Sequence, residues 1–353
     1  MNTQLYDLLS PDECNALVEQ LDTLIAKAGD AQWEELKREL VKAGYADPNA
    51  TMDAIRHLAE RLERELNKMG RSISDIIESS PNIEEAMAEL LPEKVYLRAP
   101  FITRTHALIR EELRSFVPKI TRQYVARIDN QLVVDSITRR TTAFIDEWSR
   151  DLAILMKLDT DDTIHKLINT ALRNGNSVQQ LALRIQDSSI RNPYWRARRV
   201  AITELLRAHS YAAQEAMIQN PAIEGKRWRH SGSRFNHPRP NHVAMDGVIA
   251  AKDEPFTLSG ADGGTYSPMV PRDTCLPASE SVNCHCIVQP VVNQRVLGLL
   301  PSERERLRTQ AMARDDRKWE AQANAEKHAL ADLLRNERVD RNALRTALRR
   351  KYE

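Results

Sequence analysis

Residues 282–292 read VNCHCIVQPVV, and this stretch interrupts the helical pattern that dominates the rest of the chain. Residues 286–292 are rich in β-branched side chains and predict a short strand, as do residues 226–228. Between residues 222 and 292 the helical spacing of apolar residues stops, and glycine and proline mark loops. We therefore expect a small loop-rich α+β module near the C-terminus, accompanied by the helix over 195–219.

The composition separates this region from its surroundings. Residues 221–290 hold six of the 11 glycines, eight of the 16 prolines, three of the four cysteines and four of the nine histidines. The whole chain has 353 residues, with 5% aromatic and 29% charged residues. Few aromatic residues, few glycines and many charges favour a mainly α fold. The net charge of +1 argues against a globally basic DNA-coating protein or an acidic tail protein.

Two helical regions are expected before the module, over residues 1–92 and 101–219. The first is predicted as a bundle of four helices. The first of these begins after Ser10, the second ends at Gly44, the third ends at Gly70, and the fourth spans 82–91. Cys14 and Val41 are placed on the apolar stripes of the first two helices. In the second region, residues 121–158 form one long helix or two. Further helices are predicted over 162–173, capped by the acidic run 159–162, and over 177–185 and 194–219.

Residues 293–353 are predicted as a charged C-terminal helical tail. Residues 301–353 contain 14 basic and 10 acidic residues, which gives this segment a charge of +4. A thin apolar stripe follows the helical spacing at Leu330, Leu333, Leu334, Leu344 and Leu348. We expect one helix from Pro301 to the end of the sequence, either docked on a partner or partly mobile.

Several functional classes lack support in the sequence. There is no run of 18 apolar residues, so we expect no membrane-spanning helix and no membrane partner. The N-terminal residues do not resemble a signal peptide, and four cysteines do not form a disulfide scaffold, which favours a reducing compartment. The P-loop, GxGxxG, GxSxG and HExxH motifs are all missing.

Cysteine and histidine in the module allow a metal site as one of three interpretations. On a strand, Cys284 and Cys286 point to the same side, with His285 on the other. With His242 and Cys275 they would form a Cys₃His set typical of structural zinc. Two alternatives stay open, namely buried cysteines that only pack the module and a disulfide between Cys275 and Cys284.

His242 and Asp246 also allow a catalytic interpretation. His242 would act as a base, Asp246 would orient it or bind a metal, and Glu204 would join them. In the alternative, Asp246 and Gly247 form a turn, His242 holds the loop, and Glu204 with Thr203 anchors the preceding helix. No activated nucleophile is evident, so we name no catalytic residue.

Arginines surround the module and raise the question of nucleic-acid binding. Guanidinium groups pair well with phosphate, so a non-specific and salt-sensitive DNA contact is one hypothesis. A solvated surface balanced by nearby acids is the other. The candidate residues are Arg196, Arg198, Arg199, Arg227, Arg229 and Arg239.

The order of residues over 195–292 resembles a known family. A Thr-Glu pair on a helix, a tryptophan on a strand, a histidine followed by Asp-Gly, and a closing Asn-Cys-x-Cys occur in sequence. These residues are Thr203, Glu204, Trp228, His242, Asp246, Gly247, Asn283, Cys284 and Cys286. This arrangement resembles the C-terminal module of the phage Mu protein F-like head morphogenesis family, the minor capsid proteins of tailed phages. His285 stands where that family usually has arginine.

The resemblance implies a non-enzymatic minor head protein that acts in procapsid assembly. It would be found in the procapsid and virion interior, and in the host cytoplasm during assembly. Expected partners are the portal protein, the scaffold or the major capsid protein, and packaged DNA. The alternatives are a metal-dependent nuclease or hydrolase that uses His242 and Asp246, and a toxin-delivery module.

Overall fold

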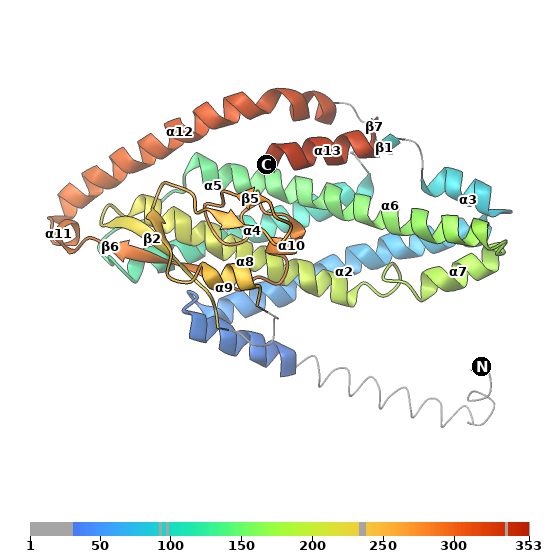
Figure 1. The fold of residues 1–353 in the computed structure, drawn as a ribbon, viewed down its shortest axis with the longest axis horizontal. Coiled ribbons are helices and arrows are strands. Elements are labelled where there is room, and N and C mark those ends of the chain that lie inside the picture. The colour runs from blue at the N-terminus through green and yellow to red at the C-terminus, as the bar shows by residue number, and fades with distance from the viewer. Residues whose placement is uncertain (1–30, 92–93, 97–98, 233–237, 336–337, 353) are drawn as a thin grey trace.

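Four long helices lie side by side along the long axis of the molecule and form its helical body (Figure 1). The computed structural model describes residues 31–91, 94–96, 99–232, 238–335 and 338–352. The helices of the body are α2 (Pro48–Ser79), α4 (Pro100–Ala126), α6 (Ser149–Arg173) and α8 (Tyr194–Gln219). Shorter helices α3 (Ile83–Leu90) and α7 (Val178–Gln186) lie at one end. The predicted mainly α fold with a small α+β module is confirmed.

One buried apolar cluster runs through the body. It combines side chains from residues 33–66, 101–120, 144–158 and 197–212, and α8 packs against both α2 and α4. The predicted regions 1–92 and 101–219 thus share a core, which explains why α8 is buried along most of its length.

The first described helix, over residues 31–43, ends as predicted. Gly44 has a φ of +84°, a left-handed conformation that glycine adopts without steric cost. Val41 is 59% exposed, so its placement on the apolar stripe was wrong. The predicted helix start at Ser10 and the buried position of Cys14 lie outside the described residues.

Gly70 does not end a helix, which corrects a second prediction. Helix α2 continues through this residue to Ser79. A Cβ atom at position 70 would lie 2.4 Å from the carbonyl oxygen of Ile190. The glycine therefore allows a close approach between α2 and the segment before α8.

Residues 121–158 form two helical stretches rather than one. Helix α4 ends at Ala126, and a loop leads to α5 (Arg139–Ala143), the π-helical turn η1 (Phe144–Trp148) and α6. The predicted start of a helix at residues 159–162 was wrong, because α6 passes through them. Asp161 pairs with Lys157 one turn earlier, and Asp159 pairs with Arg196.

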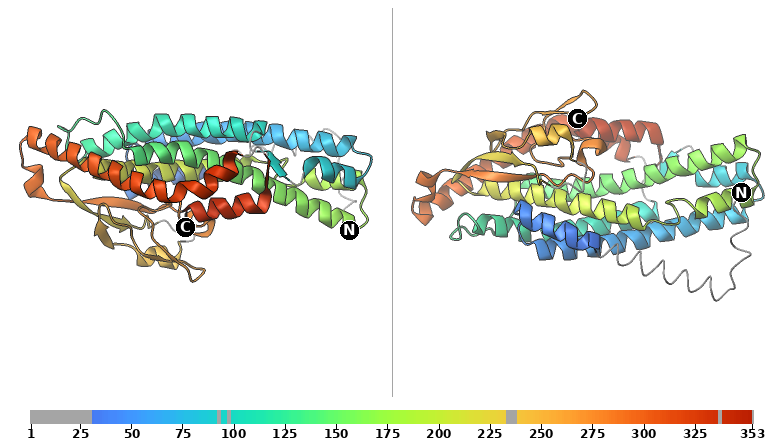
Figure 2. Two further views of the ribbon diagram at one scale, coloured as in Figure 1. Left: turned by 90° about the horizontal axis from the view of Figure 1, so that it is seen from above. Right: turned by 60° about the horizontal axis from the view of Figure 1, so that its bottom comes forward.

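The module comprises the described residues from 220 to 292 and lies against one side of the body (Figure 2). Its main sheet has the antiparallel order β3-β2-β6. A second pair, β4 and β5, and two short helices, α9 and α10, complete it. The bounds are β2 (Ile223–Arg229), α9 (Pro240–Ala244), β3 (Ile249–Ala251), β4 (Leu258–Ser259), β5 (Thr265–Tyr266), α10 (Ala278–Ser281) and β6 (Ile287–Val292). Trp228 on the central strand is fully buried in the core of the module.

The C-terminal segment folds back on the body instead of forming one helix. After α11 (Gln294–Leu297), α12 (Pro301–Arg335) runs along the body, and β7 (Arg338–Asp340) pairs with β1 (Lys94–Tyr96). Helix α13 (Arg341–Tyr352) then packs on α6, burying Leu344 and Leu348. Arg345 binds Asp162 at 2.7 Å. The tail was predicted to dock on a partner or to stay partly mobile, whereas α13 docks on α6 of the same chain. The side chains of Leu330, Leu333 and Leu334 lie outside the described residues.

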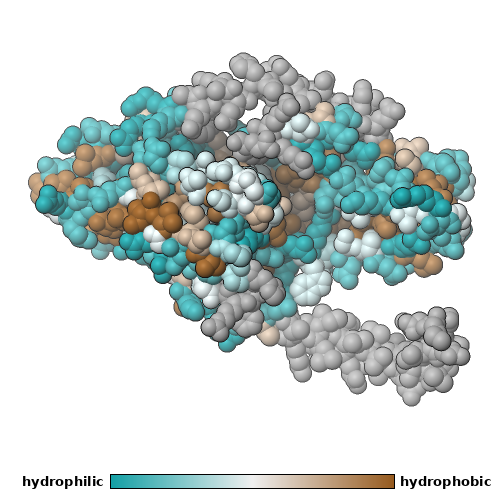
Figure 3. Space-filling view, in the orientation of Figure 1, coloured by the Kyte–Doolittle hydropathy of each residue, from teal (hydrophilic) through white to brown (hydrophobic). Residues whose placement is uncertain are grey.

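The surface is mostly hydrophilic in the view of Figure 3, with scattered apolar patches. Among the described residues, no helix combines the length and the apolar character needed to cross a membrane.

Candidate functional site

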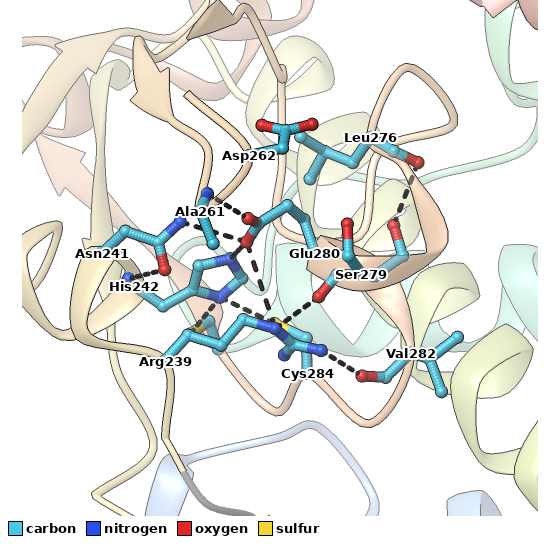
Figure 4. A network of polar contacts seen from close by, with 12 residues as sticks. Arg239, Asn241, His242, Ala261, Asp262, Leu276, Ser279, Glu280, Val282 and Cys284 are labelled. Carbon is cyan, nitrogen blue, oxygen red and sulfur yellow. Dashed lines mark hydrogen bonds and ion pairs between the residues drawn. The ribbon is translucent and has the colours of Figure 1, made fainter. Parts of the chain in front are cut away.

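His242, Cys284 and Cys286 meet in the interior of the module. Figure 4 shows His242 between Glu280 and Cys284. His242 lies on α9, which begins with Pro240, and the cysteines lie on the segment that leads into β6. The Nδ1 atom of His242 is 3.5 Å from Sγ of Cys284 and 3.8 Å from Sγ of Cys286. All three potential ligand atoms lie within 4.8 Å of one another.

Backbone geometry brings the cysteines to this position. Asn283 has a φ of +55°, a left-handed conformation that asparagine tolerates better than most residues. The predicted alternation is confirmed, because His285 points away from the cysteines and binds Glu39 of the first described helix at 2.6 Å. Tyr45 donates to the carbonyl oxygens of His285 and Cys286, which attaches this segment to the body.

Glu280 on α10 orients the histidine. Its Oε2 atom is 2.8 Å from Nε2 of His242, and its carboxylate accepts hydrogen bonds from the Ala261 amide and the Asn241 side chain. Burial raises the pKa of Glu280, but these hydrogen bonds and His242 outweigh it and keep the pKa below its usual value. An ionised Glu280 accepts a hydrogen bond from Nε2–H, which leaves Nδ1 turned toward the two sulfurs.

Arg272 supplies a buried positive charge beside the cysteines. It is fully buried and donates to the carbonyl oxygens of Cys284 at 2.7 Å and Cys286 at 2.8 Å. A hydrogen bond with Cys286 lowers the pKa of Cys284 well below its usual value against the effect of burial, and His242 and Arg272 add to this. The pKa of Cys286 is raised by Cys284 and by burial. A thiolate on Cys284 is therefore favoured, whereas a second thiolate on Cys286 is disfavoured.

Cys275 does not join this group. It is half-buried, its amide faces Asp273, and burial raises the pKa of its thiol. Three of the four predicted zinc ligands therefore come together, and the fourth does not. Cys275, Cys284 and Cys286 are free thiols, so the alternative of a Cys275–Cys284 disulfide is not realised in this structure.

The catalytic interpretation, which pairs His242 with Asp246 and Glu204, finds no support, because the structure does not bring these residues together. Asp246 lies in a turn closed by Gly247, which has a φ of +88°, and it accepts a hydrogen bond from the His230 amide. Glu204 binds Trp148 Nε1 at 2.6 Å and Arg207 Nε at 3.0 Å. The turn was predicted correctly, whereas the carboxylate that contacts His242 is Glu280.

The helix that carries Thr203 and Glu204 is linked to the module through Arg207. This side chain binds Glu204 and also donates to the carbonyl oxygen of Arg272. Thr203 is buried, and its hydroxyl has no hydrogen-bond partner among the described residues. The predicted anchoring is therefore indirect.

The six candidate DNA-binding arginines have different environments. Arg196 donates to Thr160 and the Met156 carbonyl, and Arg198 is buried over the Trp33 ring. Arg239 donates to the carbonyl oxygens of Ser279 and Val282, and Arg229 lies 3.5 Å from Asp246. Arg199 and Arg227 are exposed. Half of the set, Arg196, Arg198 and Arg239, therefore serves internal contacts.

The burial of the site limits its chemistry. Cys284, His242 and Glu280 stand in the order of a nucleophile, a base and an orienting acid. Their exposed fractions, however, are 3%, 2% and 0%. A substrate would have to open the module to reach the sulfur, so the arrangement suits a holding role better than catalysis.

Glu280 and Arg272 were not among the predicted site residues. Arg272 stands in the Pro-Arg-Asp stretch at 271–273, and Glu280 lies four residues before Cys284. Buried positions for these charged residues follow from the tertiary fold. Only their closeness in the sequence to Cys284 and Cys286 could have indicated a role in the site.

Comparison with known proteins places this site in a family. Residues 162–289 match the family described as "Phage Mu protein F like protein". An "Uncharacterized protein YqbB" from Bacillus subtilis (strain 168) is 32% identical over 311 residues, covering 86% of this chain and 99% of the relative. The chain belongs to the phage Mu protein F-like family. The resemblance noted in the sequence is thereby confirmed.

The Mu F-like match spans all the site residues described above and reaches back into α6 and α8. Membership indicates a phage head-related protein that associates with other capsid components. No solved structure matches the chain.

Proposed function

We propose that this Mu F-like protein is a minor head protein that enters the assembling procapsid and contacts the portal or the scaffold. The observation that carries the proposal is the close packing of the Mu F-like module against the helical body. Ile287 of β6 belongs to the core cluster of the body, and Arg272 donates to Ser210 of α8 at 2.6 Å. A module with a buried polar centre, packed against a helical body, suits a building block of an assembly.

An edge of the module offers a surface for such contacts. Strand β3 pairs with β2 on one side and forms the edge of the main sheet. Val248, which precedes this strand, and Ile249, its first residue, are 40% and 54% exposed. Apolar side chains at an unpaired strand edge favour association with another chain.

The test uses procapsids assembled in infected cells. We expect the chain to be present in purified procapsids and to co-purify with the portal protein. Replacing Val248 and Ile249 together by aspartate should reduce its incorporation several-fold. The control is Leu183→Asp, because Leu183 is also an exposed apolar residue, at 60%, but lies on α7 at the other end of the body. Procapsids and virions that lack the chain entirely would contradict the proposal.

Contact with packaged DNA and the lack of an enzymatic role are two further parts of the proposal. The exposed Arg199 and Arg227 support a non-specific contact, which should weaken as salt rises. Replacing both by glutamine should lower DNA retention at low salt.

Turnover of DNA or peptide that disappears in His242→Ala, while the fold persists, would contradict a non-enzymatic role.

A further inference from the structure

We propose that Nδ1 of His242 and the sulfurs of Cys284 and Cys286 bind a zinc ion that links α9 to the segment before β6. The spacing of the three atoms is the first argument. In tetrahedral zinc with Zn–S bonds of about 2.3 Å and Zn–N bonds of about 2.0–2.1 Å, neighbouring N and S ligands lie about 3.6 Å apart. The two N–S distances here are 3.5 and 3.8 Å.

The direction of the nitrogen lone pair is the second argument. The Nε2 atom of His242 faces the carboxylate of Glu280 at 2.8 Å, and because a carboxylate only accepts hydrogen bonds, we assign the proton to Nε2. The Nδ1 atom then has a single lone pair, yet it faces two sulfurs. One lone pair cannot accept two good hydrogen bonds, whereas a cation in the centre would be ligated by all three atoms.

The residues around the ligands complete the pattern of a zinc site. Histidines that bind metals commonly donate their other ring N–H to a carboxylate, which fixes the tautomer. Glu280 takes this role, and it is itself held by Asn241 and the Ala261 amide. Arg272 donates to the carbonyl oxygens of Cys284 and Cys286, which fixes the backbone that presents both sulfurs.

The donor atoms select the metal. Two sulfurs and one imidazole nitrogen suit zinc, whereas magnesium and calcium take oxygen ligands. Three protein ligands leave a fourth position for water or another donor. The proposal concerns the stability of the module and does not depend on its role in assembly.

The experiment is elemental analysis of the purified full-length chain. We expect about one zinc per chain in the wild type and in Cys275→Ser, whose cysteine lies outside the group. In Cys284→Ser and Cys286→Ser zinc should fall at least tenfold. Glu280→Gln should retain the ligands but bind zinc 10–100-fold more weakly, because the histidine is less well oriented.

A second measurement guards against variants that fail to fold. Cobalt added to the wild-type chain after zinc removal should give the visible absorption of a tetrahedral ion with thiolate ligands, and zinc should abolish it. A wild-type chain that binds neither metal when each is supplied alone would overturn the proposal. Equal loss of zinc in Cys275→Ser and Cys284→Ser would overturn the assignment of ligands.

Discussion

In the helical body, α2 buries mainly apolar side chains, such as Ile55, Leu58 and Leu62, whereas in the module the largest buried side chains include Arg272 and Lys226. The body gains stability from non-directional apolar burial, which is proportional to area. The module uses directional contacts instead, because Arg272 holds two carbonyl oxygens and Glu280 holds His242. A loss of volume should therefore harm the body most, and a loss of one polar group should harm the module most.

The first prediction addresses the apolar core of the body. Leu62 on α2 is fully buried, so Leu62→Ala should lower the free energy of unfolding by about 2–5 kcal/mol. Leu183→Ala, at a residue that is 60% exposed on α7, should change it by less than about 0.5 kcal/mol. Urea unfolding of both variants measures the difference. Similar effects would mean that the core has been placed wrongly.

The second prediction addresses the polar interior of the module. Arg272→Met leaves two buried carbonyl oxygens and the Ser210 hydroxyl without their donor and should cost about 2–4 kcal/mol. Arg227→Met removes the same charge from an exposed position and should be nearly neutral. Thermal unfolding compares them, and a neutral Arg272→Met would break the contrast between the two regions.

The third prediction concerns the close contact within the body at Gly70. A methyl group there meets the carbonyl oxygen of Ile190, so Gly70→Ala should cost about 1–3 kcal/mol although alanine favours helices. Gly298→Ala is the control, because the same Cβ atom would meet only ordinary contacts at 3.5 Å. Denaturant unfolding measures whether Gly70→Ala lowers or raises the free energy of unfolding. A stabilised Gly70→Ala would show that the approach of residue 190 is looser than described.

The fourth prediction concerns the pH dependence of stability that arises from His209, which is buried on α8 and lies in the field of Arg272 of the module. Burial lowers the pKa of His209 on α8 to about 3, so the folded state holds this histidine neutral. The unfolded chain, with an ordinary value near 6.5, binds the proton first, and stability falls as pH drops below about 6.5. Between pH 7 and 5.5 the loss from His209 should be about 1 kcal/mol.

Replacing this histidine tests its share of the pH dependence. His209→Gln should reduce the slope of unfolding free energy against pH, and His106, whose pKa burial also lowers, should supply part of the remainder. An unchanged slope in His209→Gln would contradict the assignment. The exposed His165 on α6 gives the control substitution.

Much of the body could be predicted because its helix boundaries are local signals. Pro193 and Asn220-Pro221 flank α8 at the predicted residues, and Ser177 forms a capping box with Gln180. The errors arose where tertiary contacts override such signals. Gly70 serves a neighbouring segment, and Asp161 pairs within α6.

In the candidate site, too, some residues could be predicted from local signals and others could not. His242, Cys284 and Cys286 were identified because histidine and cysteine carry recognisable chemistry in a loop-rich region. Glu280 and Arg272 were missed because charged residues are usually exposed, and only the fold buries them beside the cysteines. Cys275 was included by residue type alone, and the chain places it elsewhere.

Hydrogen exchange of the full-length chain, with zinc and after zinc removal, tests the contrast between the regions most directly. The account predicts that amides of α9, α10 and the segment leading to β6 lose protection when zinc is removed, while α2, α4 and α8 keep theirs. Equal protection in both states, or a loss spread evenly over the body and the module, would contradict it.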